Sequence, residues 1–344
     1  MKIIISLIFL TILPLVTTFL ITLQFFPLTA GSAAVAGNID NNHLSDSSSV
    51  GIPATDFNKS KTLRIAVVGD VDSNQGLTKQ LELANQYNVQ VFVIPGDFEY
   101  TNGKDVLSSL QSHGFSKENT DIVVGNHDSG GDVQSWLASK KTFGEITFGI
   151  SGDKLALFNI DANINFDCSS PEFEILKSQI QSSKALYKFA VVHENKSINW
   201  IIVYTFRSFY SSNTTHPGQE ELRDAYHPLF DKYGVDVVLQ AHNHNYQRTY
   251  PISYNVTTPS SPIITNRNTE NYTNIENGQI FITLGTGGAE FYNFTAQAPF
   301  IVKQLLLHGF LNMDVANNGS KLWITFYENT CVARDHLTIS KIKA

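Results

Sequence analysis

Short runs of hydrophobic residues alternate along this chain with segments in which hydrophobic residues recur every three or four positions. The runs are rich in Val, Ile and Phe, end at polar residues or glycine, and span 63–68, 89–94, 121–124, 155–160, 200–204 and 235–239. Continuous runs of this length are typical of strands that are buried on both faces. Helical periodicity lies between them, at 77–84, 173–180 and 222–233. This alternation predicts an α/β fold, and further strand patterns at 279–284 and 322–327 complete the sheet or add a second one.

The N-terminal segment predicts export. An apolar run from Ile3 to about Phe26 precedes small residues that suit cleavage after Ala34 or Ala36. The run is also long enough to span a bilayer, so residues 1–36 are expected to be a signal peptide or an N-terminal membrane anchor. Asn-X-Ser/Thr sequons support export and predict a glycoprotein; they begin at Asn58, Asn195, Asn213, Asn255, Asn271, Asn293 and Asn318. We expect an extracytoplasmic protein, secreted or anchored to the cell membrane.

The rest of the chain is expected to form one domain. Residues 37–60 are polar and lack hydrophobic periodicity, which predicts a flexible linker before a domain at 61–344. Residues 253–277 are rich in Ser, Thr, Asn and Pro, which predicts a long loop. The two cysteines, Cys168 and Cys331, form either one disulfide or two thiols, so the fold does not depend on a disulfide framework. A net charge of −7 argues against a nucleic-acid-binding protein, which needs a basic face.

Polar clusters follow five of the predicted strands, where open α/β sheets hold their functional sites. The clusters are Gly69-Asp70, 96–100, 125–128, 203–207 and 241–248. Two metal ions about 3.5–4 Å apart need a bridging carboxylate and mixed oxygen and nitrogen ligands. Carboxylates, an amide, a phenol and two imidazoles from different strand ends suit that requirement. Each cluster alone is weak evidence, but the ordered set indicates a two-metal site.

The set resembles the signature of the calcineurin-like metallophosphoesterases. The residues that carry the resemblance are Asp70, Asp97, Asn126-His127-Asp128 and the His242-X-His244 pair. Tyr100, three residues after Asp97, is similar to the purple acid phosphatase variant, as are 200–204, 246–248 and 285–288. The similarity extends over about residues 62–340. It implies a β-sandwich of mixed sheets flanked by helices, with the metal site at the C-terminal ends of strands.

The resemblance also implies a role for each residue. The first metal would be Fe(III), because tyrosinate favours a hard, oxidised ion, and its ligands would be Asp70, Asp97, Tyr100 and His244. The second metal would be Fe(II), Zn or Mn, held by the bridging Asp97, Asn126 and His242. A metal-activated hydroxide would attack phosphorus in line. The expected catalytic residues are His127, which binds a phosphoryl oxygen or protonates the leaving group, Asp128, which orients His127 or caps a turn, and the substrate-facing His216.

One position departs from the family pattern. The family has a second-metal histidine where this chain has Phe206, and Ser208 stands where the pattern has proline. Three interpretations stay open: the second metal binds weakly, His193 replaces the lost ligand, or the protein is a degenerate member with one metal or none. Asp72 also replaces a glycine of the pattern, and we expect it to cap the helix that begins near Gly76.

Three functions from different classes follow. The first is an exported, acid-phosphatase-like phosphomonoesterase that acts on small phosphate esters. The second, favoured by Phe206, is a catalytically weakened or non-catalytic surface-binding protein. The third is a phosphodiesterase or nucleotidase on the same scaffold, which Tyr100 disfavours because such relatives usually lack that tyrosine.

Overall fold

The computed structural model describes most of the chain from residue 62 onward. The described residues are 62–72, 76–98, 100, 103–128, 135–136, 143–148, 153–160, 170–189, 198–275, 278–316 and 319–341. The predicted signal peptide or anchor at 1–36 and the predicted linker at 37–60 therefore lie outside them. Within these ranges, no helix combines the length and apolar character needed to cross a membrane.

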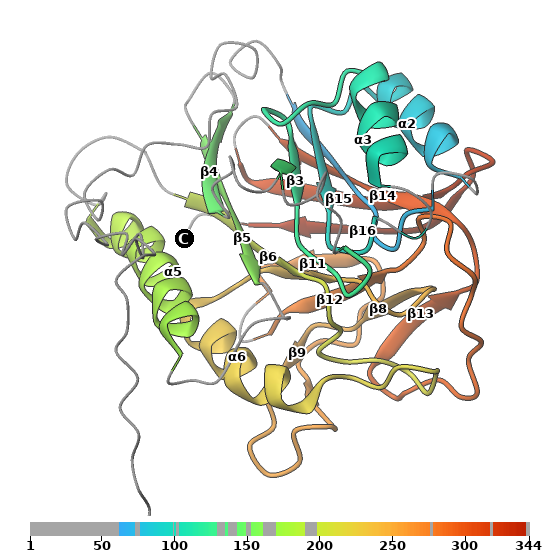
Figure 1. The fold of residues 1–344 in the computed structure, drawn as a ribbon. Helices are drawn as coiled ribbons and strands as arrows, with labels where there is room; N and C mark the ends of the chain where they lie inside the picture. The colour runs from blue at the N-terminus through green and yellow to red at the C-terminus, as the bar shows by residue number, and fades with distance from the viewer. Residues whose placement is uncertain are drawn as a thin grey trace, which may run out of the picture. The chain divides into compact units, whose positions relative to one another are not determined.

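Two seven-stranded sheets form the centre of the domain (Figure 1). The first has the order β11 (Asn271–Thr273), β16 (Ala333–Ser340), β15 (Lys321–Glu328), β14 (Gly309–Ala316), β1 (Thr62–Val67), β2 (Val91–Ile94) and β3 (Thr120–Ile122). Strands β1, β2 and β3 are parallel, whereas β14 pairs antiparallel with β1. The carboxyl ends of the three parallel strands consequently meet at one edge of the sheet.

The second sheet is also mixed. Its order is β13 (Ile301–Leu305), β8 (Tyr246–Thr249), β12 (Ile280–Leu284), β7 (Val237–Gln240), β6 (Ile198–Thr205), β5 (Asp153–Ile160) and β4 (Phe143–Phe148). Strands β5, β6, β7 and β12 are parallel, and β4 and β8 pair antiparallel at either side of them. A small separate sheet joins β9 (Ile252–Ser253) to β10 (Ile263–Ile264).

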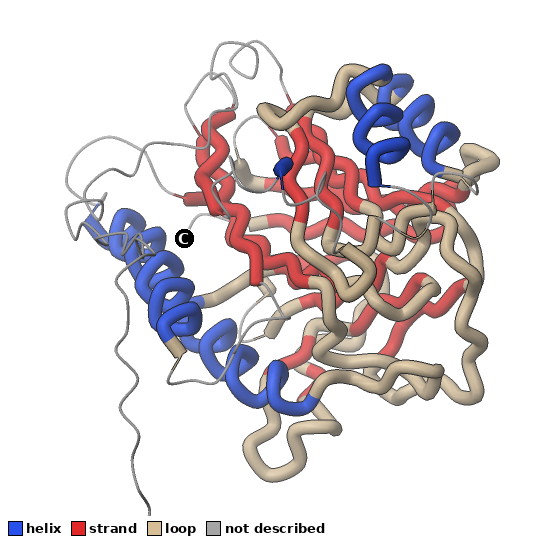
Figure 2. Tube along the Cα trace, viewed as in Figure 1, coloured by secondary structure: helices blue, strands red, loops and turns tan. Residues whose placement is uncertain are grey.

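Helices cover the outer faces of both sheets (Figure 2). On the first sheet lie α2 (Leu77–Gln86) and α3 (Gly103–Ser112), which share a buried cluster with β2. On the second lie α5 (Pro171–Phe189) and α6 (Glu220–Tyr233), which share a cluster with β5 and β6. The largest cluster joins strands of both sheets. The predicted α/β fold of mixed sheets flanked by helices is confirmed.

Two buried polar links also join the sheets. Arg248 of β8 donates from Nε and Nη2 to Asp335 of β16, at 2.6 and 2.9 Å, and the Tyr246 hydroxyl donates to the same carboxylate at 2.8 Å. The hydroxyl of Tyr204 on β6 donates to Asp121 on β3. Desolvated ion pairs of this kind contribute little net stability when intact, but removing one partner is strongly destabilising.

The expected elements occur close to their predicted positions, with one correction at a helix start. The hydrophobic stripe of α2 is buried as expected, with Leu77, Leu81 and Ala84 inaccessible to solvent. The N-cap residue of this helix is Gly76, so the expectation that Asp72 caps it is wrong. In the predicted loop at 253–277, the chain forms the short strands β10 and β11.

Candidate metal centre

Three of the predicted site residues have a strained backbone. Asp70 follows β1, Asp97 follows β2 and His242 follows β7, and their φ angles are 55°, 52° and 68°. Residues other than glycine seldom adopt positive φ, and each such residue costs about 1–3 kcal/mol. Strain of this kind persists where the surrounding structure enforces it, and it is concentrated at functional sites.

Glycines let the loops approach one another closely. A Cβ atom at Gly125 would lie 1.9 Å from Oδ1 of Asp97. A Cβ atom at Gly285 would lie 2.0 Å from the carbonyl oxygen of Asn243 and 2.9 Å from Oδ2 of Asp70. Any larger residue would therefore push the carboxylates out of place. Residues 285–288, which resemble the purple acid phosphatase pattern, thus belong to a loop that packs beneath the site.

Four of the predicted ligands converge at one point. The hydroxyl oxygen of Tyr100 lies 3.1 Å from Asp70 Oδ1, 3.0 Å from Asp97 Oδ2 and 2.7 Å from His244 Nε2. His244 also approaches Asp70 directly, since its Nε2 lies 3.3 Å from Asp70 Oδ1. A single hydroxyl proton cannot satisfy three acceptors at once. Two carboxylates, a phenol and an imidazole are the donor set that a hard, oxidised metal ion prefers, so these residues fit the first metal.

His244 is oriented by groups outside this set. Its Nδ1 lies 2.7 Å from the carbonyl oxygen of Glu290, so Nδ1 carries the proton and Nε2 presents a lone pair to the site. Ring orientation by a hydrogen bond on the far nitrogen is typical of metal-binding histidines. The ring of Tyr292 stacks on His244 at 4.0 Å between centroids. The sequence analysis missed Glu290 and Tyr292, because nothing in their spacing distinguishes them from other loop residues.

The charges at this point are unfavourable without a cation. Burial and the nearby Asp70 raise the pKa of Asp97 to about 7. Burial and both carboxylates hold the pKa of Tyr100 well above its usual value. Burial alone would lower the pKa of His244, but the hydrogen bond to Asp70 and its charge raise it instead. A bound cation would favour the charged carboxylate and phenolate, which reverses these shifts.

The convergence depends on the tyrosine. Within the described part of the chain, no group of three or more His, Cys, Asp and Glu side chains is arranged to hold a metal ion by itself. Tyr100 supplies the hydroxyl that lies between Asp70, Asp97 and His244. The candidate first site therefore consists of these four side chains together.

The second predicted ligand set is less complete. The backbone N–H of His242 donates to Asp70 Oδ2 at 2.8 Å, and its ring stacks on His216 with 4.1 Å between centroids. Burial lowers the pKa of His242 to about 4, so the ring is neutral and able to bind a metal. Asn126 is exposed at the end of β3. These residues and the bridging Asp97 supply three donors.

Phe206 fills the remaining space. Its side chain is inaccessible to solvent, and its ring lies 4.8 Å from that of His242. A Cβ atom on Gly96, which precedes Asp97, would lie 2.4 Å from a carbon of the Phe206 ring. The aromatic ring is thus packed directly beneath the carboxylate turn, and it has no atom that can bind a metal. The donor chemistry therefore fits the second metal poorly.

His127 and Asp128, the predicted catalytic residues that follow β3, have different surroundings. Asp128 is buried and accepts hydrogen bonds from three backbone N–H groups, those of Gly125, Asp97 and Phe98, at 2.7–2.8 Å. These contacts give it a structural role in shaping the Asp97 turn. His127 is exposed, its ring lies 4.4 Å from that of Tyr100, and its backbone N–H donates to Asp97 Oδ1.

A hollow of about 270 Å³ opens beside the second ligand set. His216, His242 and Arg207 line it together with residues 217–221. Burial lowers the pKa of His216, and the ring of Tyr292 lies 5.0 Å away. The hollow brings a guanidinium group and two imidazoles to the side of the candidate metal centre. His193 and Cys168 lie outside the described residues.

Comparisons with known proteins agree with this arrangement. The family model for calcineurin-like phosphoesterases matches residues 63–246, which is more than half of the chain. The chain therefore belongs to the calcineurin-like phosphoesterase family, whose two-metal members include the purple acid phosphatases. Within that family the matches support the purple acid phosphatase branch: purple acid phosphatase 22 of Arabidopsis thaliana is 23% identical over 58% of this chain and 48% of its own length.

Other relatives extend the comparison. A nucleotide pyrophosphatase/phosphodiesterase of Hordeum vulgare is 23% identical over 79% of this chain and 76% of its own length. The chain spans about half the length of the first Arabidopsis relatives that it matches, at 48% and 50%.

Solved structures show the same fold. Purple acid phosphatase PPD1 from yellow lupin (Lupinus luteus) seeds has a TM-score of 0.63 at 20% identity, covering 83% of this chain and 55% of that one. GAP50, described as the anchor in the inner membrane complex of Plasmodium, has a TM-score of 0.56 at 16% identity, covering 83% and 90%. The predicted metallophosphoesterase-type sandwich is thereby confirmed.

Proposed function

We propose that this protein is an exported, metal-dependent phosphomonoesterase that hydrolyses small phosphate esters. The observation that carries the proposal is the meeting of Asp70, Asp97 and His244 around the hydroxyl of Tyr100, with separations of 2.7–3.1 Å. Export is supported by the apolar N-terminal run and the sequons. The relatives named as acid phosphatases support the reaction class.

The proposed first metal is Fe(III), with Asp97 as the bridge to a weaker second site for Fe(II), Zn or Mn. When bound, the metals supply Lewis-acid activation of the phosphate group and of the attacking water. Oδ1 of Asp97 accepts the N–H of His127 and Oδ2 faces Tyr100, so both oxygens of the proposed bridge are oriented. With Asn126 and His242 alone beside it, the second site is proposed to bind its metal weakly.

The remaining side chains are proposed to position the substrate. His127 is exposed over the ring of Tyr100, where its imidazole can donate to a phosphoryl oxygen or protonate the leaving alcohol. His216 and Arg207 line the adjoining hollow, where both can donate to anionic oxygens. Asp128 acts indirectly, through the backbone N–H groups that hold the Asp97 turn.

The test measures metal content and hydrolysis of 4-nitrophenyl phosphate on the same purified full-length protein. The wild type is expected to contain iron and to turn over the ester, and Asp97→Asn to lose both. Asp105→Asn, an exposed aspartate of α3, is the matched control and should change neither. Wild-type protein that contains iron but hydrolyses no phosphate ester would refute the enzymatic proposal, and full activity in Asp97→Asn would refute the metal assignment.

A non-catalytic surface protein is the second candidate. The specific observation that favours it is Phe206, which is fully buried against Gly96 and excludes the usual second-metal histidine. GAP50, named as an anchor, shares the fold, so the scaffold also serves a protein described by a structural role. An iron-containing protein that turns over neither phosphate monoesters nor diesters would favour this candidate. Hydrolysis of a diester such as bis(4-nitrophenyl) phosphate in preference to the monoester would favour a phosphodiesterase.

A further inference from the structure

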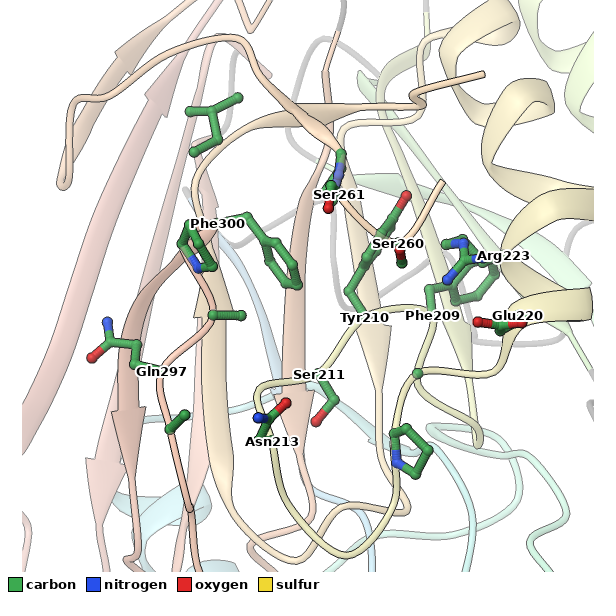
Figure 3. Close-up of a pocket in the computed structure, with 17 residues that line it drawn as sticks. Phe209, Tyr210, Ser211, Asn213, Glu220, Arg223, Ser260, Ser261, Gln297 and Phe300 are labelled. Carbon is green, nitrogen blue, oxygen red and sulfur yellow. The ribbon is translucent and has the colours of Figure 1, made fainter. Parts of the chain in front are cut away.

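A second cavity lies next to the candidate metal centre but outside it. It has a volume of about 440 Å³ and is lined by residues 209–213, 217–223, 260–264 and 296–300 in part (Figure 3). Its size is within the range that holds small organic ligands. It shares Pro217, Gly218 and Glu220 with the hollow beside His242, so one short segment borders both spaces. None of the four residues assigned to the first metal is among the described residues that line it.

Arg223 is the unusual feature of this cavity. It lies in the first turn of α6, is only 5% exposed, and lines the cavity wall. Its Nε donates to Asp224 Oδ1 at 2.8 Å. Neither terminal nitrogen forms a hydrogen bond to any residue that the structure describes. The two terminal nitrogens are the edge of the guanidinium that binds carboxylate or phosphate in a bidentate manner.

One wall of the cavity next to Arg223 is aromatic. The ring of Tyr210 lies 5.9 Å from the Arg223 guanidinium and 5.5 Å from the ring of Phe300. Figure 3 shows Tyr210 between the other two side chains. The Tyr210 hydroxyl is engaged at 2.7 Å with His227 Nδ1, so Tyr210 offers the cavity its ring and not a free donor. A cationic donor therefore stands at one end of an aromatic wall.

We propose that this cavity binds a small organic oxyanion with an apolar body. Its carboxylate or phosphate oxygens accept hydrogen bonds from the two terminal nitrogens of Arg223, and its body packs against Tyr210 and Phe300. The α6 N-terminus adds a favourable partial positive charge. The negative charge of Glu220 would repel the anion. Glu220 is exposed and forms no ion pair with Arg223, so water screens this repulsion. This proposal does not depend on phosphoesterase activity.

The test is calorimetric titration of sodium benzoate into the full-length protein, with inorganic phosphate in a parallel titration. Wild-type protein is expected to bind one equivalent of at least one of these probes. Arg223→Met should weaken that binding at least about tenfold, because the charged bidentate contact is lost. Arg267→Met is the control, since Arg267 is an exposed arginine that lines neither this cavity nor the hollow beside His242, and this variant should bind the probes as the wild type does. Asp97→Asn should also bind benzoate as the wild type does, which separates this site from the metal centre.

A further variant keeps the proposal testable if Arg223→Met fails to fold. Glu220→Gln removes an exposed opposing charge and is expected to tighten binding about two- to fivefold, more at low salt than at high salt. Loss of binding in Asp97→Asn with retention in a folded Arg223→Met would assign the probe to the metal centre and overturn the proposal. Absence of saturable binding of both probes, or unchanged affinity in Glu220→Gln, would overturn it as well.

Discussion

Replacing Phe206 by histidine is expected to convert a weak second metal site into a strong one. The Phe206 side chain is fully buried, and burying a phenyl ring contributes about 1.5–3 kcal/mol. An imidazole in its place adds the cost of desolvating a polar ring, about 1–3 kcal/mol from mutational data. Without metal, the free energy of unfolding of Phe206→His should therefore be about 2–4 kcal/mol lower than that of the wild type. Phe206→Leu, the matched control, should lose about 1–2 kcal/mol.

Metal binding should restore the lost stability of Phe206→His but not that of Phe206→Leu. A ligand that binds only the folded state at 100 times its Kd stabilises that state by about 2.7 kcal/mol. Thermal unfolding of the three proteins, with chelator and with excess Zn, measures this difference. Phe206→His should recover most of its lost stability with Zn, gain close to one metal per chain over Phe206→Leu, and hydrolyse 4-nitrophenyl phosphate faster. Equal metal content and equal Zn response in the two variants would refute the assignment of position 206 to the second site.

Three more predictions concern the first metal, the sheet contact and α6. Tyr100→Phe should abolish the visible tyrosinate-to-iron absorption of the iron-loaded protein without unfolding it; an unchanged spectrum would exclude tyrosine ligation. Arg248→Met should lower the free energy of unfolding by about 3–5 kcal/mol in urea denaturation, because the buried Asp335 carboxylate loses its cationic partner and keeps only the Tyr246 hydroxyl; a loss below 1 kcal/mol would contradict this. His227 is buried and neutral, bonded to Tyr210 and Gln279, and burial lowers its pKa from 6.5 to about 4. Its unfolded form binds a proton first, so stability should fall by up to about 3 kcal/mol as the pH falls from 6.5 to 4, and His227→Gln should lose that part of the pH dependence.

Much of the fold could be predicted because its central strands are buried on both faces. Such strands appear as unbroken hydrophobic runs, as in β2 and β7. The sequence analysis missed β14, in which Asn312 and Asp314 interrupt the hydrophobic pattern, and β16, where charged residues mark a half-exposed strand. It also missed α3, whose hydrophobic stripe of Val106, Leu107 and Leu110 is short and set among serines. Surface elements such as α3 and β16 carry less of the hydrophobic signal because one face meets water, whereas β14 is a central strand whose signal is broken by its two polar residues.

The candidate site, like the fold, has residues that could be predicted from the sequence and residues that could not. Residues at strand ends could be predicted, because the strand places the polar group that follows it. The contacts of Tyr292 and of the Glu290 carbonyl with His244 could not, since they depend on the path of a loop that only tertiary packing determines. The buried Arg223 was missed for another reason: a single arginine at a helix start resembles any solvated surface residue until its burial is known.

The four residues that meet at Tyr100 come from both sheets. Asp70, Asp97 and Tyr100 follow strands of the first sheet, whereas His244 follows β7 of the second. A metal held there would act as a noncovalent cross-link between the two halves of the sandwich. Metal binding would then stabilise the packing of the two sheets, and that packing would in turn stabilise metal binding. Any substitution that destabilises the sheet interface should therefore lower the affinity for the metal, however far it lies from the ligands.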